Sequence, residues 1–154
     1  SRWDPIEEKL RPAPVPRTES PRSRASDGPR FDAHKVLEAM GAEASVFSRL
    51  RVLRRELEGF KGSSLETVRQ MVEVFPEGCA RRRAAAALLE AGIPSNPRDA
   101  VDLVEDFDKE IDRRWCLGIL ARSGRLRGRE LERALEMLSS PAARRRVEAA
   151  AELG

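Results

Sequence analysis

The sequence is poor in aromatic side chains, which limits the kind of core it can form. Tyrosine is absent, and aromatic residues make up only 5% of the 154 residues. The core must therefore come from Leu, Ala, Val and Met, which suits packed helices better than a sheet rich in β-branched and aromatic residues. Long apolar runs are missing as well. None approaches the roughly 18 residues of a membrane span, so we expect no membrane segment.

Cysteine and histidine are equally scarce. Cys79 and Cys116 stand 37 residues apart, and His34 is the only histidine. A structural zinc site needs four ligands at short spacing, so we predict no metal and no other cofactor. Both cysteines fall on apolar faces of expected helices, where a buried free thiol is typical. With no secretory signal pattern, these features predict a nuclear or cytoplasmic protein in a reducing compartment.

What the chain does contain divides into two unlike parts. Residues 1–30 hold six of the ten prolines and almost no apolar periodicity. Such a Pro-, Arg- and Ser-rich segment cannot bury enough surface to offset its ordering entropy. We therefore predict a disordered leader over 1–30 and a helical domain over 31–154.

Helix signals follow one another from residue 31 to the end. Ser63-Ser64-Leu65-Glu66 reads as a capping box, while Asn96-Pro97 and Ser140-Pro141 each place an N-cap before a proline. Gly92 and Gly124 stand where a helix ends in a left-handed residue. The pattern predicts about eight helices joined by short loops, with no strand.

The helices repeat with a register of 32 residues. Met71 falls on Leu103 and Leu135, and Leu88 falls on Leu120. Because one helix pair cannot bury both of its apolar faces, such units must stack. We expect two capping helices over 31–62 and repeats over 63–98, 99–130 and 131–154, arranged as a right-handed α-α superhelix.

The last unit, Leu131 to Gly154, resembles a HEAT-type repeat. It has an L-x-x-A-L-x-x-L first helix and an R-x-x-A-A-x-x-L second helix. Residues 79–92 match the second pattern well, and residues 111–124 match it more loosely, with Trp115 at an alanine-sized position. The resemblance covers about residues 65–154. It implies a scaffold that binds proteins, since only a minority of such arrays bind nucleic acid.

The repeat also aligns three arginine pairs, which we call the arginine ladder: Arg81/Arg82, Arg113/Arg114 and Arg145/Arg146. Arginine forms bidentate contacts with carboxylate and phosphate. Three interpretations stay open: pairing with acids of the neighbouring unit, binding of an acidic peptide, and binding of nucleic acid. No aromatic residues are seen to interleave the ladder, which weakens base stacking as a mode of binding.

No arrangement of residues suggests catalysis. The acidic stretch from Asp99 to Asp112 is interpreted as a solvated helix face, and no nucleophile–base pair or glycine-rich phosphate loop is present. Trp115 is expected to fill the core between units. We predict that the protein is not an enzyme.

Trp3 is a second candidate binding residue. An isolated tryptophan in the leader has no core to join, and large aromatics commonly anchor short binding motifs. Together Arg2, Trp3 and Asp4 resemble the core of a U2AF-homology-motif ligand, a tryptophan peptide of splicing factors. The resemblance implies that Trp3 enters a pocket of the partner while Asp4 is contacted.

These features predict a non-catalytic protein-interaction scaffold or adaptor of a larger assembly, with splicing as one context. Its partner would be a peptide or helix, bound by the ladder or by the motif around Trp3. The alternative is a helical repeat that binds RNA or a ribonucleoprotein through the arginine ladder.

Overall fold

The computed structural model describes residues 31–154, and the predictions for residues 1–30 lie outside this range. Backbone contacts separate Ala33–Gly154 as one unit. It is all-helical, with eight α-helices and no strand in the described range, which confirms the all-α prediction. The helices are α3 (Ala33–Ala42), α4 (Val46–Glu56), α5 (Leu65–Glu73), α6 (Cys79–Glu90), α7 (Pro97–Glu105), α8 (Glu110–Arg122), α9 (Gly128–Glu136) and α10 (Pro141–Leu153), with a 3-10 turn, η2 (Leu57–Phe60), after α4.

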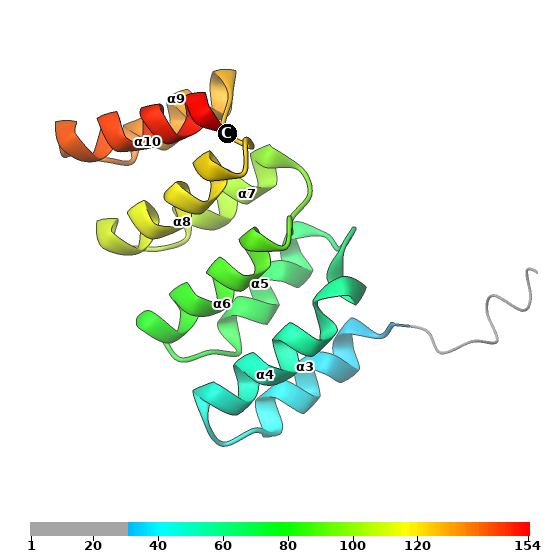
Figure 1. Cartoon of the computed structure of the whole chain (residues 1–154). Coiled ribbons are helices and arrows are strands. Elements are labelled where there is room, and N and C mark those ends of the chain that lie inside the picture. The colour runs from blue at the N-terminus through cyan, green and yellow to red at the C-terminus, as the bar shows by residue number, and fades with distance from the viewer. Residues whose placement is uncertain (1–30) are drawn as a thin grey trace, which may run out of the picture. The chain divides into compact units, whose positions relative to one another are not determined.

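The helices form four hairpins that stack in chain order (Figure 1). In each hairpin a first helix (α3, α5, α7 or α9) packs on the second helix that follows it (α4, α6, α8 or α10). First helices also pack on first helices and second helices on second helices, so the stack has two layers. This packing fits the expected superhelical stack. The pair α3–α4, which we expect to cap the stack, lies at its N-terminal end.

The helix ends follow their sequence signals, with one difference. Asn96 and Ser140 cap α7 and α10 through their side chains. Ser64 caps α5 by accepting a hydrogen bond from the Thr67 amide at 3.2 Å. Glu66 is therefore one residue too early for the N3 position of a capping box, and it makes no return bond to the serine. The capping-box prediction is thus correct only for its serine half.

Two glycines end the second helices as predicted. Gly92 and Gly124 adopt φ values of 81° and 77°, a region that side chains with a Cβ avoid. The amide of Ile93 then bonds back to the carbonyl of Leu88, and that of Arg125 to Leu120, as in a Schellman motif.

The core is mainly aliphatic, with Phe60, Phe75 and Phe107 also buried in it, and it is continuous along the stack. The stretch Ala84–Leu89 of α6 is entirely buried, because α6 packs against α4, α5 and α8 together. Leu88 and Leu120 occupy equivalent core positions, as the repeat predicts. The small alanines of α6 allow the neighbouring helices to approach closely.

The register changes in the last unit. Ala134, not Leu135, takes the fully buried position of Met71 and Leu103. The reason is the connection before α9, which spans residues 123–127 and is one residue shorter than the connection over 91–96. The last step of the repeat is therefore 31 residues, and the alignment of Leu135 with Leu103 is wrong.

The two cysteines lie in different environments. Both are free. Cys116 is fully buried in α8, and burial, followed by the nearby Asp112 carboxylate, raises the pKa of its thiol to about 12. Cys79 is exposed, because it is the first residue of α6 and lies at the edge of the packed layer. The prediction of two buried thiols is wrong for Cys79.

We expect Ellman's reagent at about pH 8 to modify only Cys79 in the folded protein, because thiolates are the reactive form and Cys116 is protonated and buried. Unfolding in guanidinium should expose the second thiol, and Cys79→Ser should leave the folded protein unreactive. Because folding raises the pKa of the Cys116 thiol, this thiol ionises at a lower pH in the unfolded chain than in the folded protein. This thiol's contribution to stability is therefore complete below pH 9.0 and is lost as the pH rises toward 12. Equal reaction of both thiols in the folded protein would contradict this packing.

Candidate functional site

One arginine in each hairpin holds the turn between the two helices. Its Nε donates to the main-chain carbonyl six residues earlier, in the turn that precedes the second helix. The bonds run from Arg49 to Glu43 (3.0 Å), Arg81 to Phe75 (2.8 Å), Arg113 to Phe107 (2.6 Å) and Arg144 to Leu138 (2.7 Å). We call these residues the turn arginines. They satisfy carbonyls that end the first helix, where intrahelical donors run out.

The positions of the turn arginines show that the predicted alignment of the arginine ladder is wrong in the last hairpin. Arg81 and Arg113 belong to the turns of their own hairpins, and each also donates through Nη2 to a second carbonyl, that of Glu73 or Glu105. In the last hairpin the equivalent residue is Arg144, so Arg145 does not align with Arg113. Arg145 corresponds instead to Arg82 and Arg114, and Arg146 to Trp115. The cause is again the shorter connection before α9.

Arg82 joins two neighbouring hairpins. Its Nη1 lies 3.2 Å from an oxygen of Asp112 in α8, and both side chains are largely buried. The positions equivalent to Asp112 in α6 and α10 are Ala80 and Ala143. Asp112 instead carries a charge at this buried position, and because an unpaired buried charge is costly, its carboxylate pairs with Arg82 of the preceding hairpin. This is the pairing between units that the sequence suggests for the ladder.

Trp115 is exposed, and the prediction that it fills the core is wrong. Its side chain is 55% exposed on α8. The guanidinium of Arg82 lies over the ring at 4.8 Å from its centroid, an attractive cation–π arrangement. Trp115 corresponds to Arg51 and Arg83 in the earlier hairpins, so this position faces outward along the whole stack.

Much of the acidic stretch of α7 and its turn is paired rather than simply solvated. Arg69 of α5 forms two hydrogen bonds to Asp106, at 2.8 and 3.3 Å, and that bond raises the pKa of Arg69. Arg133 of α9 lies 2.7 Å from Asp102 and 2.9 Å from Glu105. The first helices are therefore tied together by ion pairs on both sides of α7.

The remaining acids of this stretch differ in their surroundings. Glu110 accepts hydrogen bonds from the amide and hydroxyl of Ser139, which lower the pKa of its carboxyl. Asp99 is half-buried, and Asp108 is exposed. The interpretation as a solvated face therefore holds for Glu105, Asp106 and Asp108, which are exposed although two of them are paired, and it is wrong for buried Asp112.

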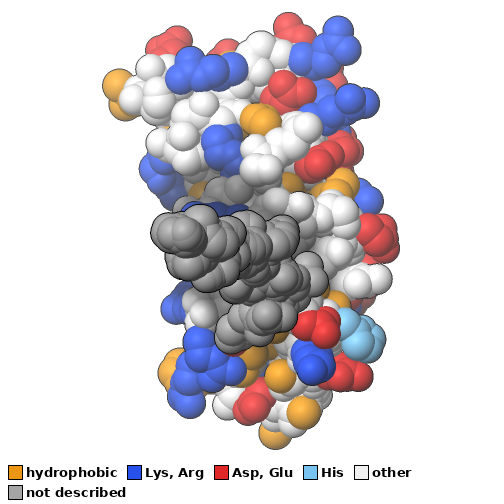
Figure 2. All heavy atoms as spheres, turned by 90° about the vertical axis from the view of Figure 1, so that its right-hand side faces the viewer, with side chains coloured by type: hydrophobic (Ala, Val, Ile, Leu, Met, Phe, Trp, Pro, Cys, Tyr) orange, Lys and Arg blue, Asp and Glu red, His pale blue; other side chains and the backbone are white. Residues whose placement is uncertain are grey.

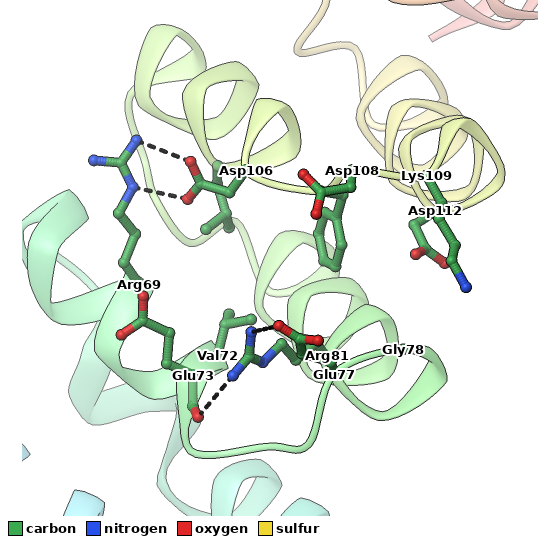
Figure 3. A pocket seen from close by; sticks show the side chains of 12 residues that line it. Arg69, Val72, Glu73, Glu77, Gly78, Arg81, Asp106, Asp108, Lys109 and Asp112 are labelled. Carbon is green, nitrogen blue, oxygen red and sulfur yellow. Dashed lines mark hydrogen bonds and ion pairs between the residues drawn. The ribbon is translucent and has the colours of Figure 1, made fainter.

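A cavity of about 590 Å³ lies between the turns of the second and third hairpins (Figure 3). Acids and bases both line it. Arg69 pairs there with Asp106, and Arg81 lies 3.7 Å from Glu77. Five acids and three bases line the cavity, so two of the bases are paired within the lining and the acids are in excess. Across residues 31–154, no three side chains of His, Cys, Asp or Glu are grouped to hold a metal ion.

A different surface runs along the second helices. Two hollows meet at Trp115, one of about 480 Å³ over α4, α6 and α8 and one of about 320 Å³ over α8 and α10. We call their combined lining the second-helix face. It comprises Phe47, Leu50, Arg51, Arg54, Arg83, Ala86, Ala87, Glu90, Ile111, Arg114, Trp115, Gly118, Arg122, Ala143, Arg146, Val147 and Ala150.

Exposed apolar side chains and arginines alternate on the second-helix face. Phe47 is 72% exposed and Ile111 58% exposed. Arg51 lies over the ring of Phe47, at 5.3 Å from its centroid. Aromatic residues therefore do interleave the arginines here, contrary to the sequence interpretation. By comparison, acidic and basic side chains are interspersed over the side of the molecule seen in Figure 2.

The structure separates the ladder residues by role. Arg81 and Arg113 hold turns, and Arg82 is paired with Asp112. Arg114 and Arg146 line the second-helix face, and Arg145 is exposed on α10. Arg2, Trp3 and Asp4 lie outside the described residues. The 32-residue register aligns Arg51 and Arg83 with Trp115, and Phe47 and Ile111 with Cys79. Sequence reasoning nevertheless missed these four residues as parts of the surface.

Replacing a turn arginine should cost stability, whereas replacing its neighbour should not. We expect Arg113→Ala to lower the free energy of unfolding by about 1–2 kcal/mol, since a charged donor to the Phe107 carbonyl is lost. Arg114→Ala is the matched control, because the exposed Arg114 side chain forms no hydrogen bond or ion pair within residues 31–154 and is only attracted through space to Glu110, so a change within about 0.5 kcal/mol is expected. Urea denaturation measures both. Equal losses in the two variants would disprove the structural role of Arg113.

Among these features only the second-helix face combines exposed aromatic side chains, hollows and arginines that form no ion pair within the described residues. None of the helices within residues 31–154 has the length and hydropathy of a membrane span. No family model, curated protein or solved structure matches the chain.

Proposed function

We propose that this chain is a non-catalytic interaction scaffold or adaptor that binds a protein partner through its second-helix face. The observation that carries the proposal is the alternation of exposed Phe47, Ile111 and Trp115 with arginines on that face. Aromatic and arginine side chains are the ones most enriched at protein interfaces. The resemblance of residues 65–154 to HEAT-type repeats, which usually serve as protein scaffolds, supports the same function.

The rigidity of the stack supports this role as well. The turn arginines hold each hairpin internally. The pairs Arg82–Asp112 and Arg69–Asp106 join the second hairpin to the third, and Arg133 joins the third to the fourth. A surface whose backbone is held in this way loses less conformational entropy when a partner binds. The larger assembly would be nuclear or cytoplasmic, and the motif around Trp3 makes RNA processing one context to examine.

Binding of RNA is the second candidate function. It is favoured by the arginines that line the second-helix face beside two aromatic rings, because nucleic acids are bound by such combinations. One fact weighs against binding of RNA. Arg81, Arg82 and Arg113 are already engaged within the fold, and this removes half of the ladder from phosphate binding.

Affinity capture with the full chain tests the proposal. We expect the double variant Phe47→Ser/Ile111→Ser to capture at least about tenfold less partner protein than the wild-type chain. The reason is that truncation of interface anchors commonly costs more than about 1 kcal/mol of binding free energy. Both side chains are exposed, so the fold should be retained. Circular dichroism and a thermal melt would check this.

The matched control is Leu153→Ser, which removes an 89% exposed apolar side chain outside the second-helix face. It should capture the partner as well as the wild-type chain does. Identical capture by the double variant would refute the proposed face. Loss of the partner after nuclease treatment would instead favour the RNA-binding candidate.

A further inference from the structure

We infer that the hollow between Phe47 and Trp115 receives a large apolar side chain from an acidic segment of the partner protein. The inference rests on the proposed function and names the chemistry of the segment that the second-helix face would bind. It is carried by the shape and lining of the hollow and by the charges around it.

The hollow has an apolar floor and two aromatic walls. Leu50, Ala86 and Ala87 are buried at its base, and Phe47 and Trp115 are exposed beside it. Small alanine side chains on α6 leave the space that longer residues would fill. With a volume of about 480 Å³, the hollow has room for more than one large side chain.

The rim of the hollow is strongly basic. Arg51, Arg54 and Arg83 are exposed there and pair with no carboxylate in the described part of the chain. Arg69, Arg82 and Arg133, in contrast, each pair with an acid of the neighbouring hairpin. Glu90 is the one acid that lines the hollow, so three arginines outnumber it and an acidic partner segment would neutralise the remaining positive charge. Complementary charge of this kind steers association and fixes orientation.

The rings are arranged less well for nucleic acid. Arg51 covers one face of Phe47, and Arg82 covers one face of Trp115. Bases bind such platforms by stacking on open ring faces, whereas an aliphatic or aromatic side chain needs only the floor and the ring edges. Residues 1–30 as a whole carry seven Lys and Arg against five Asp and Glu, but residues 3–8 combine three acids with Trp3 and Ile6, so this stretch of the chain itself is the competing occupant.

A random-peptide display selection against the full chain tests the inference without a known ligand. We expect the enriched peptides to place Asp or Glu on both sides of a Phe, Leu, Ile or Trp. The same selection against Arg51→Ala/Arg83→Ala should lose this preference. The control Arg98→Ala/Arg129→Ala removes two exposed arginines from first helices α7 and α9, and it should leave the selection unchanged.

Fluorescence then measures binding of one enriched, tryptophan-free peptide to the full chain carrying Trp3→Phe, so that emission reports on Trp115 alone. Arg83→Ala should weaken binding about tenfold, as should replacing the peptide's large apolar residue with Ala. Replacing its acids with Gln should do the same. Oligouridylate should not compete at equal charge concentration.

Three results would overturn the inference. They are enrichment of peptides without acidic residues, unchanged binding after loss of the apolar residue, and tighter binding of oligouridylate than of the peptide. Failure to select any peptide would also reject it. Suppose that one of these results is found, yet the Phe47→Ser/Ile111→Ser variant captures less partner protein than the wild-type chain. The proposed function then stands, and only the inferred chemistry of the partner segment is wrong.

Discussion

The hydrogen bond from an arginine Nε to the carbonyl six residues before it is the interaction on which this stack depends. It recurs at Arg49, Arg81, Arg113 and Arg144, in every hairpin of the described range. Each bond fixes where the second helix starts relative to the first, and so it sets the direction in which the rest of that helix points. Because the turns are held alike, equivalent positions on α4, α6, α8 and α10 come into line. Small alanines of the second helices let these helices pack closely behind that line.

This regularity explains how one residue type takes on three tasks. Arginines at the turns are bonded to main-chain carbonyls, and Arg69, Arg82 and Arg133 neutralise acids of neighbouring hairpins. The positions just beyond the turn arginines, such as Arg51 and Arg83, face outward and bond to no acid or main-chain carbonyl among residues 31–154. The outward set shares its surface with Phe47, Ile111 and Trp115. Basic and apolar groups that the fold itself leaves unused thus gather on the second-helix face.

Periodicity and caps in the sequence predict the helical architecture well, because each signal acts locally. A proline after Asn96 or a glycine at 92 determines a helix end whatever lies beyond it. The failures concern contacts between units. Trp115 has a core-like composition around it, yet its place beside Arg51 and Arg83 in the register puts it outside. A connection one residue shorter before α9 moved Arg144 into the place expected for Arg145. The sequence does place Asp112 in the turn where an acid can pair with a ladder arginine, but the burial of the pair and the identity of its partner Arg82, 30 positions earlier in the chain, follow only from the packing.

Oxidative footprinting of the full chain with its captured partner directly measures whether the second-helix face is where the partner binds. Hydroxyl radicals label exposed aromatic and aliphatic side chains, and both faces of the stack carry such groups. Binding should protect Phe47, Ile111 and Trp115 while leaving half-buried Leu131 and Leu135 of the first helix α9 as reactive as before. Protection confined to α9, with Phe47 and Trp115 still oxidised at their free rates, would contradict the account.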